Sequence, residues 1–505
     1  MPLLSVSSLR GSVPAELPAE HQRQVGPSRD RWRFAPLGLV GVLALVLVFH
    51  AAPWLTSGFG ESYDGCNGAV WGFSSRALRD DPIGSRLGGI RAPGDAYANH
   101  PPLIIGETAI VETIAGEHRI VTRSPAWLGS IVALILLCWL LLGAGLSPTA
   151  VAAGVVSTCG SAMFLVYGTM LDTPVTSLPF TLAILLAWQR ARQDRPWPSA
   201  VLVTVGILAA LAGWQSFAFA AVAVIALAID AARRRHPWRP VLSLGAGAVI
   251  GLATTLVWIR WVYGSITPLL HQRAYRSDGS PLLETTRIQL SSLWALLPIA
   301  MIIGSVGAVI AARDPRVRAL LAISTASVVG YALAFRGAAE IHDYWNYAAL
   351  IPLAIGASTG FDRLVSSVAP SRQTMFRLGS LAAAAACLII TLTHTSDAED
   401  AIETGVAAVQ LAHIAENMPH DDETALAYLM TEPSRWIEYE TGAPGLALSN
   451  MDELRRLAET EPNFPVLITY SDMTTDKRAY VIGNAFAVEG PYALVPARVV
   501  YLSQR

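Results

Sequence analysis

Long apolar runs recur along most of this 505-residue chain, and they restrict its possible folds more than any other feature. A helix needs about 20 mainly apolar residues to cross the hydrocarbon core of a bilayer. Charged residues make up only 15% of the sequence, whereas roughly 25% is usual in a soluble domain. The sequence therefore predicts a polytopic α-helical membrane protein.

The apolar runs predict about eleven transmembrane helices. The first run is as long as a full span, which exceeds the apolar core of a signal peptide, and no small-residue cleavage site follows it. We therefore expect this run to be retained as a signal anchor. The predicted spans lie near 34–56, 126–146, 148–168, 174–190, 199–213, 215–231, 241–262, 293–312, 318–335, 344–361 and 376–395.

Clusters of arginine give an independent test of this topology. If the count is right, all of them fall on one side of the membrane, and the positive-inside rule makes that side cytoplasmic. The amino-terminal tail, 1–33, is then cytoplasmic, and the carboxy terminus is extracytoplasmic. The clusters between spans lie at 190–195, 233–239, 313–318 and 363–377, and the outer segments include 57–125, 169–173, 263–292 and 336–343.

The charge balance and the cysteines argue against several other classes of protein. The net charge is −2, and no basic tract has interleaved aromatic residues, so we expect no binding to nucleic acid. The four cysteines have no metal-ligand spacing, and three of them lie in apolar runs. Nothing in the sequence indicates a redox centre or a zinc–cysteine site.

The composition changes after the transmembrane domain, 34–396, and becomes charged and globular. Asn450 with Glu453 predicts a helix start of the capping-box type. Because strands and helices alternate, we predict a small extracytoplasmic α/β domain over 397–505 with a mainly parallel sheet, which is structural or recognises the acceptor. The predicted strands are 423–430, 445–450, 464–470 and 493–502, and the predicted helices are 432–442 and 451–460.

The first outer segment, 57–125, is where chemistry is expected, because it is long, polar and bracketed by spans. Asp64 follows the first span by about eight residues, so it must lie near the membrane surface. A carboxylate there could act as general base on an acceptor hydroxyl. Asp64-Gly65 is also a common turn dipeptide, so a simple turn is the alternative.

A histidine in the same segment stands in an unusually stiff stretch of backbone. His100 is followed by two prolines, which keep it out of helical geometry. It could contact a phosphate, bind a metal, or cap the helix that begins near Leu103. The sequence leaves these three roles open.

Later outer segments add further polar side chains. Asp172, which stands two residues before a proline, either caps the next helix or lines an outward-facing cavity. Arginines in 263–292 run against the positive-inside trend, which indicates an anionic ligand such as phosphate. Tyr344, Trp345 and Tyr347 are interpreted as an interfacial aromatic belt.

Taken in order, these segments resemble the GT-C glycosyltransferases that use polyprenyl-phosphate sugars. The similarity is closest to the dolichyl-phosphate-mannose protein mannosyltransferases and their bacterial relatives, including the aminoarabinose transferases. It covers roughly residues 34–360 and depends on order and spacing. The matching residues are Asp64, His100-Pro101-Pro102-Leu103, Gly116-Glu117, Arg123-Ser124-Pro125, Asp172-Thr173-Pro174 and the stretch His342-Asp343-Tyr344-Trp345.

The resemblance implies a GT-C-like membrane domain with an inverting transferase on the outer face of the cytoplasmic membrane. The donor would be a hexose or pentose on a polyprenyl phosphate, with its lipid tail between spans, and the acceptor a hydroxyl of a protein, lipid or polysaccharide. Asp64 would be the catalytic base. The resemblance also implies donor-phosphate contacts by His100, Arg123, Arg273, Arg276 and His342, supporting acids or divalent-metal ligands in Glu61, Glu107 and Asp172, and a substrate pocket with Tyr63, Asn67 and Tyr344.

Two departures from the family pattern affect these roles. The family often has an acidic pair in the first loop, whereas here two residues separate Glu61 from Asp64, so which acid is the base stays open. The D-G-x-N-G context favours Asp64. Many relatives have lysine where His100 stands, and a phosphate contact by histidine would depend on pH.

A transporter or lipid flippase is the competing class. It predicts inverted repeats and charged or glycine-broken residues in mid-span, and we find no such repeat. The long first outer segment and the extra domain fit an enzyme better. A non-catalytic scaffold descended from a transferase is a third possibility.

Overall fold

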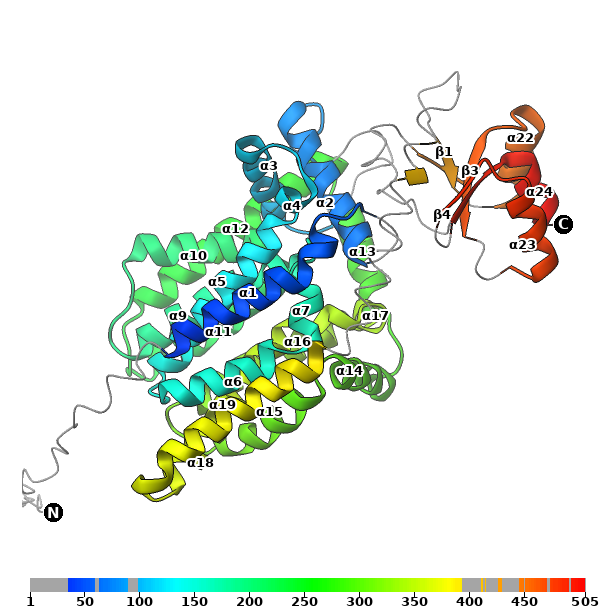
Figure 1. The fold of residues 1–505 in the computed structure, drawn as a ribbon. Helices are drawn as coiled ribbons and strands as arrows, with labels where there is room; N and C mark the ends of the chain where they lie inside the picture. Colours follow the sequence, from blue (N-terminus) through cyan, green and yellow to red (C-terminus); the bar gives the residue numbers. More distant parts are fainter. Residues whose placement is uncertain are drawn as a thin grey trace, which may run out of the picture.

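The computed structural model describes residues 35–59, 63–89, 99–392, 410–411, 414, 426–428, 445–448, 450–469, 473–489 and 492–504 (Figure 1). A helical part extends to residue 392, and a small α/β part follows. The helices of the first part are α1 (Ala35–Leu55), α2 (Tyr63–Asp80), α3 (Leu103–Ala115), α4 (Arg119–Thr122), α5 (Ser124–Gly143), α6 (Pro148–Cys159), α7 (Ala162–Tyr167), α8 (Thr173–Thr176), α9 (Leu178–Arg192), α10 (Ser199–Ala212), α11 (Trp214–Ala232), α12 (Arg239–Tyr263), α13 (Thr267–Ser277), α14 (Leu282–Leu296), α15 (Pro298–Ala311), α16 (Arg318–Ala334), α17 (Arg336–Ile341), the 3-10 helix η2 (Asp343–Ala349), α18 (Leu350–Ser367) and α19 (Pro370–Leu392).

Within the described residues, each predicted transmembrane segment is mainly helical, but 148–168, 174–190 and 293–312 are each divided between two helices. Among the described residues, five helices are long and apolar enough to cross a bilayer by themselves, namely α5, α11, α12, α19 and the continuous η2–α18. A sixth candidate is the pair α14–α15, which bends by 111° where Pro298 begins the second helix. Shorter apolar helices lie within α1, α6, α10 and α16. The chain is therefore a membrane-spanning helical protein.

Small residues let these helices approach one another closely. α10 packs against α12, and α15 packs against α18. A Cβ on Gly247 would overlap the carbonyl oxygen of Val203, and a Cβ on Gly307 would overlap that of Gly356. Such close backbone contacts give the van der Waals attraction that holds helices together in lipid, where no hydrophobic effect acts between them.

The predicted arginine clusters gather at one end of the helical part, which we call the arginine end. Arg192 pairs with Asp230 at 3.2 Å, and this pair joins the last turns of α9 and α11. Arg316 donates to Asp362 at 2.9 Å, and the same carboxylate accepts the backbone N–H of Ser147 at 3.0 Å. These contacts agree with a topology in which the arginine-rich loops share one side.

The predicted outer segments gather at the opposite end, which we call the α2 end; there α2, α3, α4, α13 and α17 lie near one another (Figure 1). They fold mostly as helices rather than loops. Asp64-Gly65 lies in the first turn of α2, which continues for 18 residues. The turn interpretation of this dipeptide is therefore wrong.

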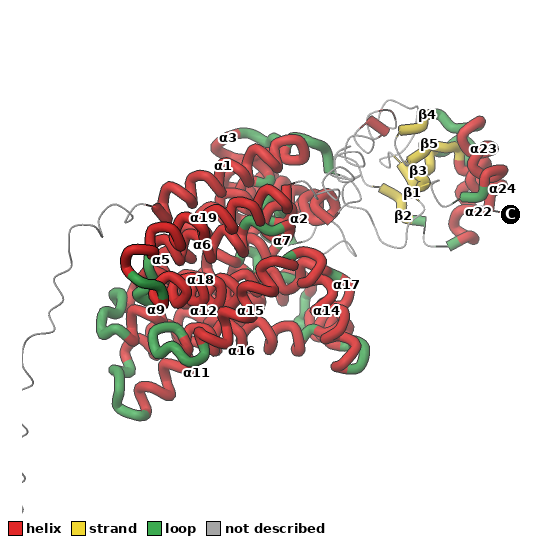
Figure 2. The backbone as a smooth tube through the Cα atoms, turned by 60° about the horizontal axis from the view of Figure 1, so that its bottom comes forward, coloured by secondary structure: helices red, strands yellow, loops and turns green. Residues whose placement is uncertain are grey.

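The small α/β part contains a mixed sheet. Its described elements are β1 (Leu426–Tyr428), β2 (Gly445–Ala447), α22 (Met451–Thr460), β3 (Pro465–Thr469), α23 (Thr475–Gly483), β4 (Ala487–Glu489), β5 (Tyr492–Pro496) and α24 (Ala497–Gln504). The strand order is β2-β1-β3-β5-β4, and the three helices lie on one face of the sheet (Figure 2). β1 is parallel to β2 and β3, whereas β5 is antiparallel to β3 and β4. The prediction of a mainly parallel sheet is therefore only half right.

Individual predictions for this part have different outcomes. Asn450 caps α22 as predicted, with its Oδ1 accepting the N–H of Asp452 and Glu453 at 3.1 and 3.0 Å. The strand predicted at 493–502 ends at Pro496 and continues as α24, because the buried side chains of that segment pack against α22 with helical spacing. The helix predicted at 432–442 lies outside the described residues.

Candidate active site

The buried guanidinium of Arg123 and the half-buried carboxylate of Asp64 form an ion pair at the α2 end. Nε and Nη2 of Arg123 both donate to Oδ2 of Asp64, at 3.0 and 2.7 Å. The guanidinium also donates to the carbonyl oxygens of Leu55 and Ser57 and lies 4.1 Å from the ring centroid of Phe59. The other oxygen of Asp64, Oδ1, is buried and has no hydrogen-bond partner within the part of the chain that the structure describes. The pair thus holds the carboxylate through one oxygen and leaves the other without a hydrogen bond.

One face of α2 continues from this pair toward the middle of the site. Asn67 is about one turn beyond Asp64, and Trp71 is about one turn further. Asn67 Nδ2 donates to the hydroxyl of Tyr344 at 3.1 Å, and Trp71 Nε1 donates to Oδ1 of Asp172 at 3.4 Å. α2 therefore connects the Asp64 carboxylate to η2 and to the start of α8.

Asp172 is the N-cap of α8, which was one of the two roles predicted for it. Its Oδ1 accepts the backbone N–H of Thr173 at 2.7 Å, and the residue is buried. Burial raises the pKa of Asp172, although hydrogen bonds from Thr173, Trp71 and Tyr344 and the charge of Arg276 act to lower it. Since its donors already surround it, Asp172 acts as a structural acceptor between α2, α8 and η2.

His100 bridges α8 and α13. Its Nδ1 lies 3.2 Å from Oγ1 of Thr173, and its Nε2 lies 3.0 Å from Nη1 of Arg276. The buried imidazole also meets the ring of Trp71 edge-on, with the centroids 5.8 Å apart. His100 does not cap α3, whose N-cap is Pro102 without a side-chain hydrogen bond.

His342 completes this cluster from the junction of α17 and η2. Burial, and then the positive charge of Arg276, lower the pKa of His342 to about 4. Burial, followed by the charges of Arg276 and His342, also lowers the pKa of His100 well below its ordinary value. Both shifts favour the neutral imidazole, which leaves Arg276 as the cation among these three side chains.

The aromatic residues of η2 are buried inside the protein. Trp345 stacks on Tyr331 of α16, with ring centroids 5.3 Å apart, and Tyr344 contacts Tyr167 of α7 at 5.1 Å. Tyr347 has no exposed surface. The interfacial-belt interpretation is therefore wrong, because η2 packs between α7 and α16 and its rings face protein.

Several predicted residues are not part of this arrangement. Arg273 is exposed on α13 and Glu107 is half-buried on α3; among the described residues neither has a hydrogen bond or ion pair with the side chains above. Burial raises the pKa of Glu107 to about 7. Glu61 and the side chain of Tyr63 lie outside what the structure describes. The roles expected of these four residues stay predictions.

The described residues do not by themselves form the divalent-metal site that was expected, and Glu61, one of its expected ligands, lies outside them. In that part of the chain, no three His, Cys, Asp or Glu side chains lie close enough together to hold a metal ion. Asp172 already accepts from Thr173 and Trp71, and Glu107 lies on a different element.

Glu117 of the Gly-Glu motif holds the connection between α3 and α4 against α2. Arg76 Nε donates to Oε1 of Glu117 at 2.7 Å, and Arg79 Nη2 donates to Oε2 at 2.7 Å. Burial raises the pKa of Glu117, but the hydrogen bonds and charges of the two arginines outweigh it and keep that pKa below its ordinary value. This motif is therefore structural in the present conformation.

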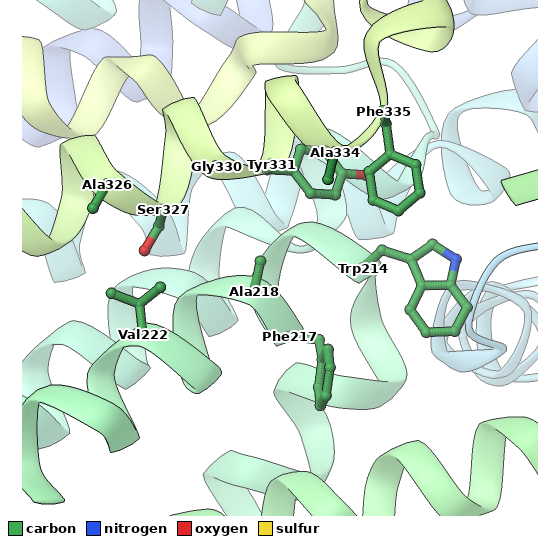
Figure 3. Close-up of a pocket in the computed structure, with 10 residues that line it drawn as sticks. All are labelled: Trp214, Phe217, Ala218, Val222, Ala326, Ser327, Gly330, Tyr331, Ala334 and Phe335. Atoms are coloured by element: carbon green, nitrogen blue, oxygen red, sulfur yellow. The ribbon is translucent and has the colours of Figure 1, made fainter. Parts of the chain in front are cut away.

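An apolar groove runs between α11 and α16 (Figure 3). Its volume is about 300 Å³. The groove leads toward the cluster just described, since Tyr331 in its wall stacks on Trp345, and Trp345 in turn lies over His342 with ring centroids 6.0 Å apart. It is lined by Trp214, Phe217, Ala218, Val222, Ala326, Ser327, Gly330, Tyr331, Ala334 and Phe335.

Sequence reasoning missed Trp71, although a signal for it existed. A helical α2 places Trp71 on the same face as Asp64 and Asn67, at spacings of seven and four residues. Reading Asp64-Gly65 as a possible turn hid that periodicity.

Comparisons with known proteins give the fold. No family model and no curated protein matches the chain. The structure of ArnT from Cupriavidus metallidurans bound to undecaprenyl phosphate is similar with a TM-score of 0.58 and 13% identity, over 92% of this chain and 98% of that one. The apo state of the same protein gives 0.56 and 12%, over 92% and 99%.

An oligosaccharyltransferase from Archaeoglobus fulgidus, in a complex with Zn and sulfate, is a more distant neighbour. Its TM-score is 0.46 at 13% identity, over 85% of this chain and 68% of that one. The agreement with ArnT extends over nearly the whole length of both chains, and it bears out the resemblance read from the ordered motifs. The chain therefore has the GT-C fold, in the form seen in the aminoarabinose transferase ArnT.

Proposed function

We propose that this protein is an inverting glycosyltransferase that moves a sugar from a polyprenyl-phosphate donor to a hydroxyl acceptor. The observation that carries the proposal is the Asp64–Arg123 pair, which orients a half-buried carboxylate and leaves one of its oxygens without a hydrogen bond. The same face of α2 continues to the cluster around Arg276, so a base and a cation lie along one path. A transfer that deprotonates an alcohol and releases a phosphate needs both.

Asp64 is the proposed general base. Oδ1 would accept the proton of the acceptor hydroxyl as that oxygen attacks the anomeric carbon. Arg123 holds Oδ2 and keeps a positive charge beside the carboxylate, so the base stays oriented while Oδ1 works. The donor-phosphate contact expected of Arg123 is less well supported, because its guanidinium is already occupied by Asp64, Leu55 and Ser57.

Arg276 is the proposed partner of the donor phosphate. As the acceptor oxygen bonds to the anomeric carbon, the bond from that carbon to the phosphate oxygen breaks, and the electron pair leaves on the polyprenyl phosphate. Attack from the face opposite the leaving group inverts the anomeric configuration. A guanidinium is well shaped to stabilise the developing phosphate charge, and such stabilisation is often the largest single contribution to catalysis.

The groove between α11 and α16 is the proposed binding site for the lipid tail of the donor. It is apolar, it lies between α11, which is long enough to cross a bilayer, and the shorter apolar helix α16, and the stack Tyr331–Trp345–His342 leads from it toward Arg276. Undecaprenyl phosphate bound to ArnT, a protein of the same fold, supports a lipid of this class here.

The two ends of the helical part would face opposite sides of the membrane. The arginine end would face the cytoplasm, by the positive-inside rule, and the α2 end would face outward. The protein would then be a multi-pass protein of the cytoplasmic membrane, with the 397–505 domain outside. A lipid-linked donor suits that side, where nucleotide sugars are not expected.

A reconstituted assay separates this function from the competing transporter class. Purified full-length protein in lipid vesicles is given a radiolabelled-sugar undecaprenyl phosphate together with an envelope extract as acceptor. The proposal predicts label on the acceptor and an equal amount of released undecaprenyl phosphate. Movement of the intact sugar lipid across the vesicle membrane without cleavage would instead identify a flippase.

A further inference from the structure

The environment of His100 differs from that of a phosphate-binding cation. The ring is 6% exposed, it is held by two following prolines, and both ring nitrogens have partners. On Nε2 the partner is Arg276 Nη1 at 3.0 Å, and on Nδ1 it is the hydroxyl of Thr173 at 3.2 Å.

These two contacts determine where the imidazole proton is. A guanidinium can only donate hydrogen bonds, so Nε2 must offer its lone pair to Arg276. In a neutral imidazole the proton then resides on Nδ1, where Thr173 Oγ1 accepts it. A doubly protonated ring would place an N–H against the Arg276 N–H and two positive charges side by side.

We propose that His100 is a neutral hydrogen-bond acceptor that positions Arg276 for the donor phosphate, and is not itself a phosphate-binding cation. This inference rests on the proposed function, and it assigns a different task to the position where many relatives have lysine. Thr173, which begins α8, and His100 connect the N-terminal turn of that helix to α13, so Arg276 is aimed by a fixed path rather than by a flexible side chain alone.

The surroundings of the ring support the neutral form. Burial and the nearby charges of Arg276 and His342 all disfavour a proton on Nε2. The carboxylate of Asp172 accepts hydrogen bonds from Thr173 and Trp71. The contact with Trp71 is edge-on, at an interplanar angle of 78°.

A double-mutant cycle on binding of undecaprenyl phosphate tests the coupling. Removing the acceptor in His100→Ala should weaken binding about tenfold, and Arg276→Ala should weaken it by about 10- to 100-fold. Because His100 acts only through Arg276, the double variant should bind as weakly as Arg276→Ala alone. If the two losses multiply, His100 contacts the phosphate independently and the proposal is overturned.

A second test, which does not need His100→Ala to fold, replaces His100 with side chains that either can or cannot accept a hydrogen bond. His100→Gln retains a neutral acceptor and should bind undecaprenyl phosphate within about threefold of wild type. His100→Lys cannot accept from Arg276 and should bind more weakly than His100→Gln. The reverse order, with lysine better than glutamine, would show that a cation is what the position needs.

The protonation state can be read without any lipid, which separates this inference from the proposed function. Solid-state NMR of the full-length protein labelled with 15N-histidine, in lipid bilayers, is compared between wild type and His100→Gln to assign the His100 signals. The expected result is a neutral ring protonated on Nδ1. An imidazolium, or a neutral ring protonated on Nε2, would overturn the proposal whether or not the protein transfers sugar.

Discussion

Arg123 binds Asp64 through a single carboxylate oxygen, Oδ2, which accepts from Nε at 3.0 Å and from Nη2 at 2.7 Å. A side-on pair that used both oxygens would leave neither free for an acceptor hydroxyl. The observed geometry neutralises the carboxylate within the protein and still leaves Oδ1 available. The pair therefore has a structural task and a chemical one, and variants can separate them.

Loss of the guanidinium should destabilise the protein through the charge left behind. Arg123→Met leaves the half-buried Asp64 carboxylate unpaired, which should lower the free energy of unfolding by about 3 kcal/mol. Adding Asp64→Asn removes that charge and should restore much of the loss. Thermal unfolding in detergent checks both variants; a double variant no more stable than Arg123→Met would contradict the pairing.

Narrowing the groove between α11 and α16 tests whether it binds the lipid tail, and a glycine outside the groove provides a matched control. A Cβ on Gly330 of α16 meets nothing within 4 Å, and the same is true of Gly379 on α19, which does not line the groove. Gly330→Phe should exclude about two methylenes of the lipid, each of which contributes about 0.8 kcal/mol when buried, and so raise the KM for the donor roughly tenfold. Gly379→Phe should leave it unchanged. Equal effects of the two would mean that the lipid lies elsewhere.

The Tyr344 hydroxyl should matter for activity rather than for insertion. It accepts from Asn67 and donates to Asp172, and so joins α2 to the start of α8. Tyr344→Phe leaves the Asn67 amide without that acceptor, and kcat/KM should fall roughly tenfold. Tyr275→Phe, at an exposed site on α13, is the control. Unchanged transfer by Tyr344→Phe would remove this residue from the site.

Two neighbouring acids should lose stability to different degrees when their charge is removed. Glu117 is held ionised by Arg76 and Arg79, so Glu117→Gln should lower the free energy of unfolding by roughly 1–3 kcal/mol at pH 7. Glu112 accepts from hydroxyls of Ser75 and Thr122, and burial raises its pKa, so Glu112→Gln should cost much less.

The contribution of Glu117 to stability should depend on pH. Because the pKa of Glu117 is lowered by folding, its contribution is present above its ordinary value of 4.5 and is lost as the pH falls through the folded value. Wild type and Glu117→Gln should therefore converge in stability in acid. Unfolding measured between pH 7 and pH 3 checks this; a constant difference over that range would contradict it.

The fold could be predicted from the sequence wherever a single physical constraint dominates. Apolar length decided the spans, and arginine placement decided which loops share an end. In the polar segments, secondary-structure propensity and hydrophobic patterning predicted the structure less well. α2 starts with a glycine-containing dipeptide typical of turns, and η2 is an aromatic stretch typical of a membrane interface, yet packing makes one a helix and buries the other.

The candidate site was predictable as a set of residues but not as a set of contacts. Order and spacing brought Asp64, Arg123, Asp172 and Tyr344 together correctly at one end of the bundle. They could not show that Arg123 faces Asp64 instead of open space for a phosphate. Partner choice depends on which side chains meet across helices distant in sequence, and no local pattern records it.

The most direct test of the central claim is sugar transfer by Asp64→Asn in the vesicle assay, measured beside Asp80→Asn, which changes an exposed acid at the end of the same helix. Asparagine keeps the size of the side chain but cannot accept the proton. Transfer should fall by at least about 100-fold in Asp64→Asn and stay unchanged in Asp80→Asn, with undecaprenyl phosphate still bound by both. Wild-type transfer by Asp64→Asn would contradict the account.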